Sequence, residues 1–244
     1  MGGADRTDDT MNTRTLMRRL ARWHIWLGWL IGVPLLLWTL SGLIMVVKPI
    51  EEVRGNHLRR DVAETALPPE TQIAVSLPAD PARPVRSVIT QVERGETVTR
   101  ITYMDGTAER YRMDGSPMGS LSEIEARMIV AERIVGGDAV VDATRFGAEE
   151  PPLDFRRPEP VWQVALRDGT HVYVGTETGE IAAVRTRWWR IFDFMWGLHI
   201  MDLETREDTS HPALILFAAL SLLGTLIGIT LLFRRRKARR RSQS

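Results

Sequence analysis

The chain has 244 residues and no cysteine. The absence of cysteine excludes disulfide bonds, thiolate metal sites, thiolate-held iron–sulfur clusters, cysteine nucleophiles and covalent c-type haem attachment. The sequence also lacks the HExxH, GxSxG and phosphate-loop glycine patterns, and it has no nicotinamide- or flavin-binding fingerprint. We therefore expect that the chain draws no electrons directly from a soluble nucleotide, and the sequence leaves open whether it is an enzyme.

Charged residues are missing from two long apolar segments, Trp23 to Val47 and Pro212 to Phe233. Each is longer than the roughly 20 residues that a helix needs to cross the hydrocarbon of a bilayer. The first segment is also longer than the apolar core of a cleaved signal peptide, and it runs into Lys48-Pro49. We interpret it as a retained membrane anchor.

Basic residues flank both segments on their terminal sides. They are Arg14, Arg18, Arg19 and Arg22 before the first, and Arg234, Arg235, Arg236, Lys237, Arg239, Arg240 and Arg241 after the second. The positive-inside rule therefore predicts cytoplasmic termini and an external middle section, as in a protein of the bacterial inner membrane. Because the basic tail directly follows a span, we expect it to contact anionic headgroups and expect no nucleic-acid partner.

The middle section contains a series of β-rich runs separated by turns. The expected strands are Ser87 to Val92, Thr97 to Tyr103, Ala108 to Met113, Ala139 to Phe146, Val161 to Leu166, His171 to Val174 and Ile181 to Val184. Asp-Gly-Thr triplets begin at Asp105 and Asp168, and Asp-Gly favours tight hairpin turns. The repeated triplet suggests two half-repeats, which form either one sheet or two.

One helix is expected between the two groups of strands. Ser120 and Glu123 have the spacing of a capping box, which predicts Ser120 as the N-cap. Gly136-Gly137 is typical of a helix end. The apolar residues at helical spacing, expected to face the core, are Ile124, Met128, Ala131 and Val135.

The last two strands carry a recognisable pattern, Val172-Tyr173-Val174 followed by Thr178-Gly179-Glu180-Ile181, which resembles the end of the PepSY domain. The flanking elements resemble the PepSY-associated transmembrane family of the iron-regulated membrane protein type. The segments that carry this second resemblance are His24-Ile25-Trp26-Leu27-Gly28, Trp196-Gly197-Leu198-His199, and Gly228 with Leu231-Leu232-Phe233. The chain departs from the family at Gly175, where aspartate is common, and in having two spans where many members have four or more.

The resemblance implies an α+β fold in which two transmembrane helices flank an external PepSY-like domain of a helix and antiparallel strands. The expected segments are a cytoplasmic tail (1–22), transmembrane helix 1 (23–47), a helix extension and linker (48–86), the periplasmic PepSY-like domain (87–185), an interfacial amphipathic helix and loop (186–210), transmembrane helix 2 (211–233) and a basic cytoplasmic tail (234–244). Some relatives reduce ferric siderophores and bind b-type haem through membrane histidines. The resemblance therefore implies haem b as the cofactor to test.

Three histidines, His24, His199 and His211, lie in or beside the membrane segments and are the candidate haem ligands. Gly28 and Gly32 follow His24 at i+4 and i+8, where they allow a porphyrin or another helix to approach closely. A purely structural interpretation stays open, with Gly28-x-x-x-Gly32 and Gly224-x-x-x-Gly228 as helix-packing motifs and the histidines as interfacial residues. No residue set identifies a metal site.

The positions of the histidines restrict any haem site. His24 and His199 are expected at opposite faces of the membrane, about 30 Å apart, so they cannot bind one iron. An inner haem bound by two histidines then needs a second His24, from a homodimer or from another partner in a membrane complex. An outer haem can use His199 with His211 in one chain, or either of these histidines from two copies of the chain. We expect a haem-bearing electron-transfer or ferric-reductase-associated subunit linked to iron uptake, or else a membrane-anchored PepSY module that binds a peptidase, a peptide or an envelope partner.

Overall fold

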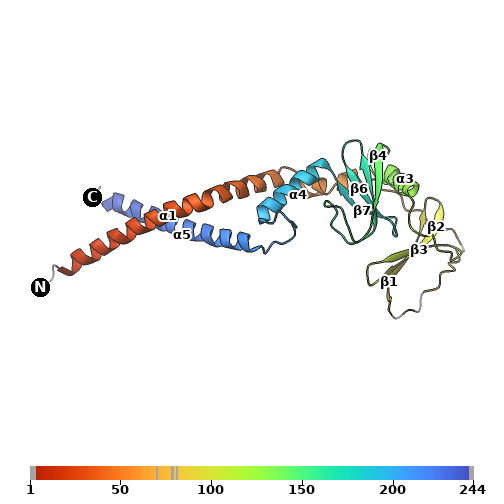
Figure 1. Ribbon diagram of the computed structural model, residues 1–244, viewed down its shortest axis with the longest axis horizontal. Helices are drawn as coiled ribbons and strands as arrows, with labels where there is room; N and C mark the ends of the chain where they lie inside the picture. Colours follow the sequence, from red (N-terminus) through yellow and green to blue (C-terminus); the bar gives the residue numbers. More distant parts are fainter. Residues whose placement is uncertain (1–3, 70, 78–79, 81, 242–244) are drawn as a thin grey trace. The chain divides into compact units, whose positions relative to one another are not determined.

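The computed structural model describes residues 4–69, 71–77, 80 and 82–241, and parts of the expected tails and linker (1–3, 70, 78–79, 81 and 242–244) lie outside them. The chain forms two compact units (Figure 1). The membrane unit comprises residues up to Val47 and from Ile191 onward, and the outer unit comprises Lys48–Arg190. The membrane unit contains the two apolar segments of the sequence, and the outer unit contains the section with the β-rich runs.

The membrane unit is built on two long helices that pack against each other, α1 (Ala4–Met45) and α5 (Pro212–Arg241) (Figure 1). Their apolar parts, Thr15–Met45 and Pro212–Arg234, are long enough to cross a membrane. Most of their large side chains are not covered by the protein, and Trp29 is 79% exposed. So large an exposed apolar surface is unfavourable in water and favourable in lipid. The expected pair of transmembrane helices is therefore present.

The third helix of this region is α4 (Arg187–Ile200), and the loop after it folds back onto the helix. Arg206 pairs with Asp193 at 2.5 Å, and its carbonyl accepts from Trp196 Nε1 at 3.0 Å. Asp202 accepts the backbone N–H groups of Thr205, Glu207 and Asp208, and its pKa is lowered chiefly by the Thr205 hydroxyl. These bonds give the connection between α4 and α5 a defined structure.

The outer unit contains two antiparallel sheets, which answers the question left open by the repeated turns. The first sheet has the order β1-β2-β3, and the second has the order β4-β5-β6-β7. The strands are β1 (Val85–Glu93), β2 (Glu96–Tyr103), β3 (Ala108–Arg112), β4 (Val140–Phe146), β5 (Val161–Leu166), β6 (His171–Gly175) and β7 (Ile181–Arg185). All seven expected strands are confirmed, with bounds that differ by at most a few residues.

The two Asp-Gly-Thr triplets adopt the same turn. In each, the aspartate Oδ1 accepts the backbone N–H of the threonine at 2.8 Å, in Asp105–Thr107 and in Asp168–Thr170. The glycine between them has φ of +86° at Gly106. This left-handed conformation is accessible to glycine without strain, which explains why the sequence repeats the dipeptide.

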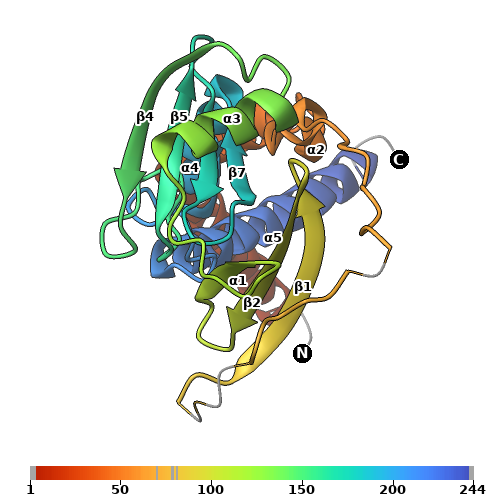
Figure 2. The ribbon, with the colours of Figure 1, turned by 90° about the vertical axis from the view of Figure 1, so that its right-hand side faces the viewer.

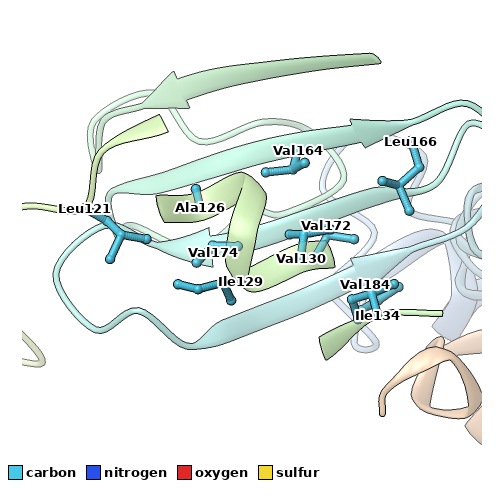
Figure 3. Packing of buried hydrophobic residues seen from close by; sticks show 10 residues of the cluster. All are labelled: Leu121, Ala126, Ile129, Val130, Ile134, Val164, Leu166, Val172, Val174 and Val184. Carbon is cyan, nitrogen blue, oxygen red and sulfur yellow. The ribbon is translucent and has the colours of Figure 1, made fainter. Parts of the chain in front are cut away.

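Helix α3 (Glu123–Arg133) lies across the second sheet (Figure 2). Short helices α2 (Ile50–Val53) and η1 (Asn56–Leu58) precede the strands. The main core lies between α3 and strands β5 to β7 (Figure 3). Its buried members are Leu121, Ala126, Ile129, Val130, Ile134, Val164, Leu166, Val172, Val174 and Val184.

Two details of the helix prediction are wrong. The N-cap is Ser122, whose Oγ accepts the Glu125 N–H, while Glu125 accepts the Ser122 N–H at 2.8 Å. The capping box is therefore shifted by two residues from the predicted Ser120 and Glu123. The expected core face is also wrong, since Ile124 is 71% exposed and Met128 is 46% exposed. Ala126, Ile129 and Val130 face the sheet instead.

The Thr-Gly-Glu pattern forms the turn between β6 and β7. Gly175 N–H donates to the Glu180 carbonyl at 2.9 Å, and Gly179 has φ of +67°. Glu180 pairs with Arg100 of β2 at 2.5 Å. The signature turn therefore connects the two sheets of the outer unit.

Candidate functional site

His24 packs against α5 through a close backbone contact. Its Nδ1 lies 3.1 Å from the Gly224 carbonyl oxygen, which can only accept a hydrogen bond. Nδ1 must therefore carry the proton, and the lone pair of the neutral ring resides on Nε2. No hydrogen bond to Nε2 occurs within the described residues. The surroundings of His24 thus select the tautomer that leaves the lone pair on Nε2.

The glycines of the two helices have different roles. A Cβ added at Gly228 would lie 2.8 Å from Cε1 of His24, and one added at Gly224 would lie 3.3 Å from Ile31. By contrast, a Cβ at Gly28 or Gly32 would meet nothing within 4 Å. The packing interpretation is therefore correct for the α5 motif. Within one chain, the α1 motif leaves an open face.

His199 of α4 packs against α1 near the other end of that helix. Its ring stacks on Trp38 with 4.5 Å between centroids, and its Nδ1 lies 3.1 Å from Ser41 Oγ and 3.2 Å from the Trp38 carbonyl. The Ser41 hydroxyl donates its one hydrogen to the same carbonyl at 2.8 Å, so it must accept from His199. His199 therefore also carries its proton on Nδ1.

The imidazoles of His24 and His199 lie far apart along α1. His24 is itself on α1, whereas His199 is held at Trp38 and Ser41. A rise of 1.5 Å per residue places these positions roughly 21–26 Å apart along the helix. One iron cannot bind both nitrogens, so each of these two positions offers a single imidazole per chain.

His211 caps α5. The Ala213 N–H donates to His211 Nδ1 at 3.3 Å, and the His211 carbonyl accepts from Leu214 at 2.9 Å. His211 itself is thus the cap of α5. An accepting Nδ1 leaves the proton on Nε2, the opposite tautomer to His199. Ligation through Nε2 would require this cap to break, and among the described residues no hydrogen bond joins His211 to His199.

The remaining histidines belong to the outer unit. His57 is exposed in η1. His171 lies 3.2 Å from Asp154 through Nδ1, and the Tyr173 hydroxyl donates to the same carboxylate. Burial alone would raise the pKa of Asp154, but the bonds from His171 and Tyr173 outweigh it and lower the pKa. Burial and the Asp154 bond raise the pKa of Tyr173. The sequence analysis did not identify this cluster.

A second carboxylate cluster lies on the first sheet. Glu109 accepts from Tyr111 at 2.6 Å, from Tyr103 at 2.7 Å and from Arg83 at 2.9 Å. The Tyr111 bond is the largest cause of the lowered pKa of Glu109, and it raises the pKa of Tyr111 to about 12. Each of the four groups is bonded to another member, and Arg83 also donates to the Thr107 hydroxyl at 3.0 Å, so we assign the cluster a structural role.

No group of three or more His, Cys, Asp or Glu side chains suited to a metal ion occurs in the part of the chain that the structure describes. Gly224 and Gly228, which contact His24, belong to a helix-packing motif that the sequence shows. Trp38 and Ser41, which contact His199, carry no such signal. A usable signal exists in α1, where His24, Leu27 and Ile31 share the i, i+3, i+7 spacing of one helix face, and these are the residues that meet α5.

Comparison with known proteins gives a single finding. Neither a curated protein nor a solved structure matches the chain. The model of a protein family described as "PepSY-associated TM region" matches residues 21–244, which is nearly the whole chain. The match includes both apolar helices, all seven strands and the Thr-Gly-Glu turn. The chain is therefore a membrane protein that belongs to the PepSY-associated transmembrane family.

Proposed function

We propose that this protein is a haem-bearing electron-transfer or ferric-reductase-associated subunit of the inner membrane, linked to iron uptake, with His24 and His199 as ligands. The observation that supports the proposal is that both imidazoles carry their proton on Nδ1. Each donates Nδ1–H to a carbonyl or hydroxyl oxygen, which leaves Nε2 as the ligating atom. Metal-binding histidines usually have such an outer partner, which fixes the tautomer and the ring orientation.

The residues present fit a haem with one histidine from each chain. Bound b-type haem would supply a one-electron carrier whose potential depends on its axial ligands and surroundings. The chain's own part is to hold each imidazole, through Gly224 and Gly228 for His24 and through Trp38 and Ser41 for His199. Two histidines at one iron require a second copy or another subunit, so the proposal includes a homodimer or a larger membrane complex.

Absorption spectra of the detergent-purified protein from haem-replete cells test the proposal. We expect a Soret band, with sharp α and β bands after reduction by dithionite. His24→Ala and His199→Ala should each reduce haem content, whereas His57→Ala should leave it unchanged because His57 is exposed in the outer unit. A featureless spectrum of folded, haem-supplied protein would contradict the proposal. Unchanged haem content in both membrane variants would contradict the ligand choice.

The proposed orientation has both termini in the cytoplasm and the outer unit in the periplasm, on the basis of the flanking arginines. Because the chain lacks cysteine, single introduced cysteines report the topology without background. We expect a membrane-impermeant maleimide to label Glu150→Cys in intact cells and to label Ser242→Cys only after lysis. The reverse pattern would overturn the orientation.

A second candidate function is a membrane-anchored module that binds a peptide or protein partner. It is supported by a cavity of about 730 Å³ in the outer unit, lined by residues 59–65 and by Ile89 to Val92 of β1. β1 is an edge strand, and Ile89 is 42% exposed. Exposed edge strands can accept an added strand. A photo-crosslinker at Ile89 should then capture a partner that the same group at Val141 does not.

A further inference from the structure

Arg110 of β3 is among the most buried charged residues of the described chain, with 3% of its surface exposed. It lies directly opposite Arg100 of β2, which is 8% exposed. Two like charges facing each other across a sheet are destabilising unless other groups compensate them. The compensation differs between the two arginines.

Arg100 is fully engaged by the Thr-Gly-Glu turn. Its guanidinium pairs with Glu180 at 2.5 Å and donates to the Thr178 carbonyl at 3.3 Å. Arg110 reaches the same turn, because a Cβ on Gly179 would lie 3.2 Å from its Nη1. However, Nε and Nη1 of Arg110 are buried without a hydrogen-bond partner in the described structure.

One candidate partner that lines the same cavity, Glu125 of α3, is already bonded elsewhere. Its Oε2 accepts from the Ser122 N–H at 2.8 Å and from the Ser122 hydroxyl at 2.6 Å. It forms no ion pair with Arg110 within 4.0 Å among the pairs that the structure describes. A buried guanidinium without a bonded partner is costly, and it needs an explanation in a folded protein.

Arg110 lines a cavity of about 340 Å³ between the first sheet and α3. Val98, Met118 and Met128 supply apolar lining, and methionine adapts readily to ligands of different shape. Glu93, Glu96 and Glu125 also line the cavity, together with Arg94 and Arg112. The site therefore combines one buried cation with apolar walls and an edge of mixed charge.

We propose that this cavity binds a small monocarboxylate with an apolar portion, and that Arg110 holds the carboxylate. A guanidinium presents two parallel N–H groups that match the two oxygens of a carboxylate. Val98 and the two methionines contact the apolar portion. The apolar walls disfavour phosphate and polycarboxylates, which have little apolar surface to bury there.

Nuclear magnetic resonance of the full-length protein in detergent, labelled with ¹⁵N-arginine, tests the site directly. Butyrate is the probe, at constant ionic strength maintained with chloride. We expect the Arg110 Nε–H resonance, identified by its loss in Arg110→Met, to shift and saturate with butyrate. Acetate should bind more weakly, and inorganic phosphate and citrate should produce little change.

Two variants separate binding from folding. Arg110→Lys keeps the charge but loses the two-pronged geometry, and we expect its affinity for butyrate to fall about tenfold or more. The resonances of Arg94 and Arg112, which line the same cavity, report this affinity. Arg145→Met, at an exposed position of β4, should bind as the unmodified protein does. No shift of the Arg110 resonance, an equal response to phosphate, or unchanged affinity in Arg110→Lys would each overturn the proposal.

Discussion

The imidazole of His24 lies against the backbone of Gly228, so closely that a Cβ at Gly228 would come within 2.8 Å of Cε1. The same ring donates to the carbonyl of Gly224, one turn earlier on α5. These two contacts explain why His24 lies next to glycines in the membrane unit. The glycines that admit the imidazole are those of the partner helix, not those that follow the histidine in its own helix.

Gly228→Ala is expected to destabilise the pairing of α1 and α5, because the added methyl group must displace the His24 ring. We expect a loss of about 1–3 kcal/mol, the range for overpacking a well-fitted contact. Gly28→Ala is the matched control, since its Cβ meets nothing within 4 Å and alanine favours helix. Thermal unfolding in detergent, followed by circular dichroism, measures both. Equal effects of the two substitutions would show that the His24–Gly228 contact is not tight.

The N-cap of α3 provides a direct test of the corrected helix start. Ser122→Ala removes the hydroxyl that bonds Glu125, so we expect a loss of about 1 kcal/mol in the stability of the outer unit. Ser120→Ala removes only a surface bond to Glu177 and should cost less than half as much. Chemical unfolding of the full chain in detergent compares the two variants. A larger effect at Ser120 would restore the cap predicted from the sequence.

Features that neighbouring residues determine can be predicted from the sequence, whereas features that depend on distant segments cannot. The turns at Asp105 and Asp168 are specified by dipeptides that favour positive φ, and the strands between them were predicted well. The face of α3 was predicted wrongly because apolar residues occur on two of its sides. Ile124 and Ile129 are equally apolar, and only the position of the second sheet decides that Ile129 is buried.

For the candidate ligands, the sequence predicts which residues they are but does not predict their protonation. The sequence identifies His24, His199 and His211 as membrane histidines, but it contains no information on which nitrogen carries the proton. That property depends on contacts with Gly224, Ser41 and the Ala213 N–H. Two of these three contacts join residues more than 150 positions apart, so no local pattern predicts them.

A comparison of substitutions at Gly55 and Gly136 distinguishes the cost of backbone strain from the cost of steric conflict in the outer unit. It has φ of +73°, and a Cβ there would lie 2.7 Å from Cγ1 of the buried Val184. Gly136 has nearly the same φ, +74°, with open space around it. We expect Gly136→Ala to cost about 1–2 kcal/mol from strain alone, and Gly55→Ala to cost about 1–3 kcal/mol more. Unfolding curves that coincide for the two variants would contradict the contact between Gly55 and β7.

Asp154 gives the outer unit a stability that depends on pH. Its carboxylate faces His171, Tyr173 and Arg190, whose Nη1 lies 3.7 Å away, and the stacked ring pair of Phe155 and Tyr173 packs beside it. The net effect of burial and these bonds is to lower the pKa of Asp154. A carboxyl group whose pKa is lower in the folded state stabilises the fold above its unfolded pKa of about 3.9, and that contribution is lost as the pH falls through the folded value.

Asp154→Asn should therefore reduce the free energy of unfolding by about 1–3 kcal/mol at pH 7, because charged hydrogen bonds to His171 and Tyr173 become neutral ones. The difference from the unmodified protein should narrow below about pH 4, where the unfolded chain binds a proton at this carboxyl group while the folded chain still holds it ionised. Asp138→Asn, at an exposed position, is the control and should change stability little at either pH. Denaturant unfolding of the full chain at pH 7 and near pH 3.5 measures both differences. A constant difference across this range would mean that Asp154 stabilises the unit by shape, and that its charge contributes nothing.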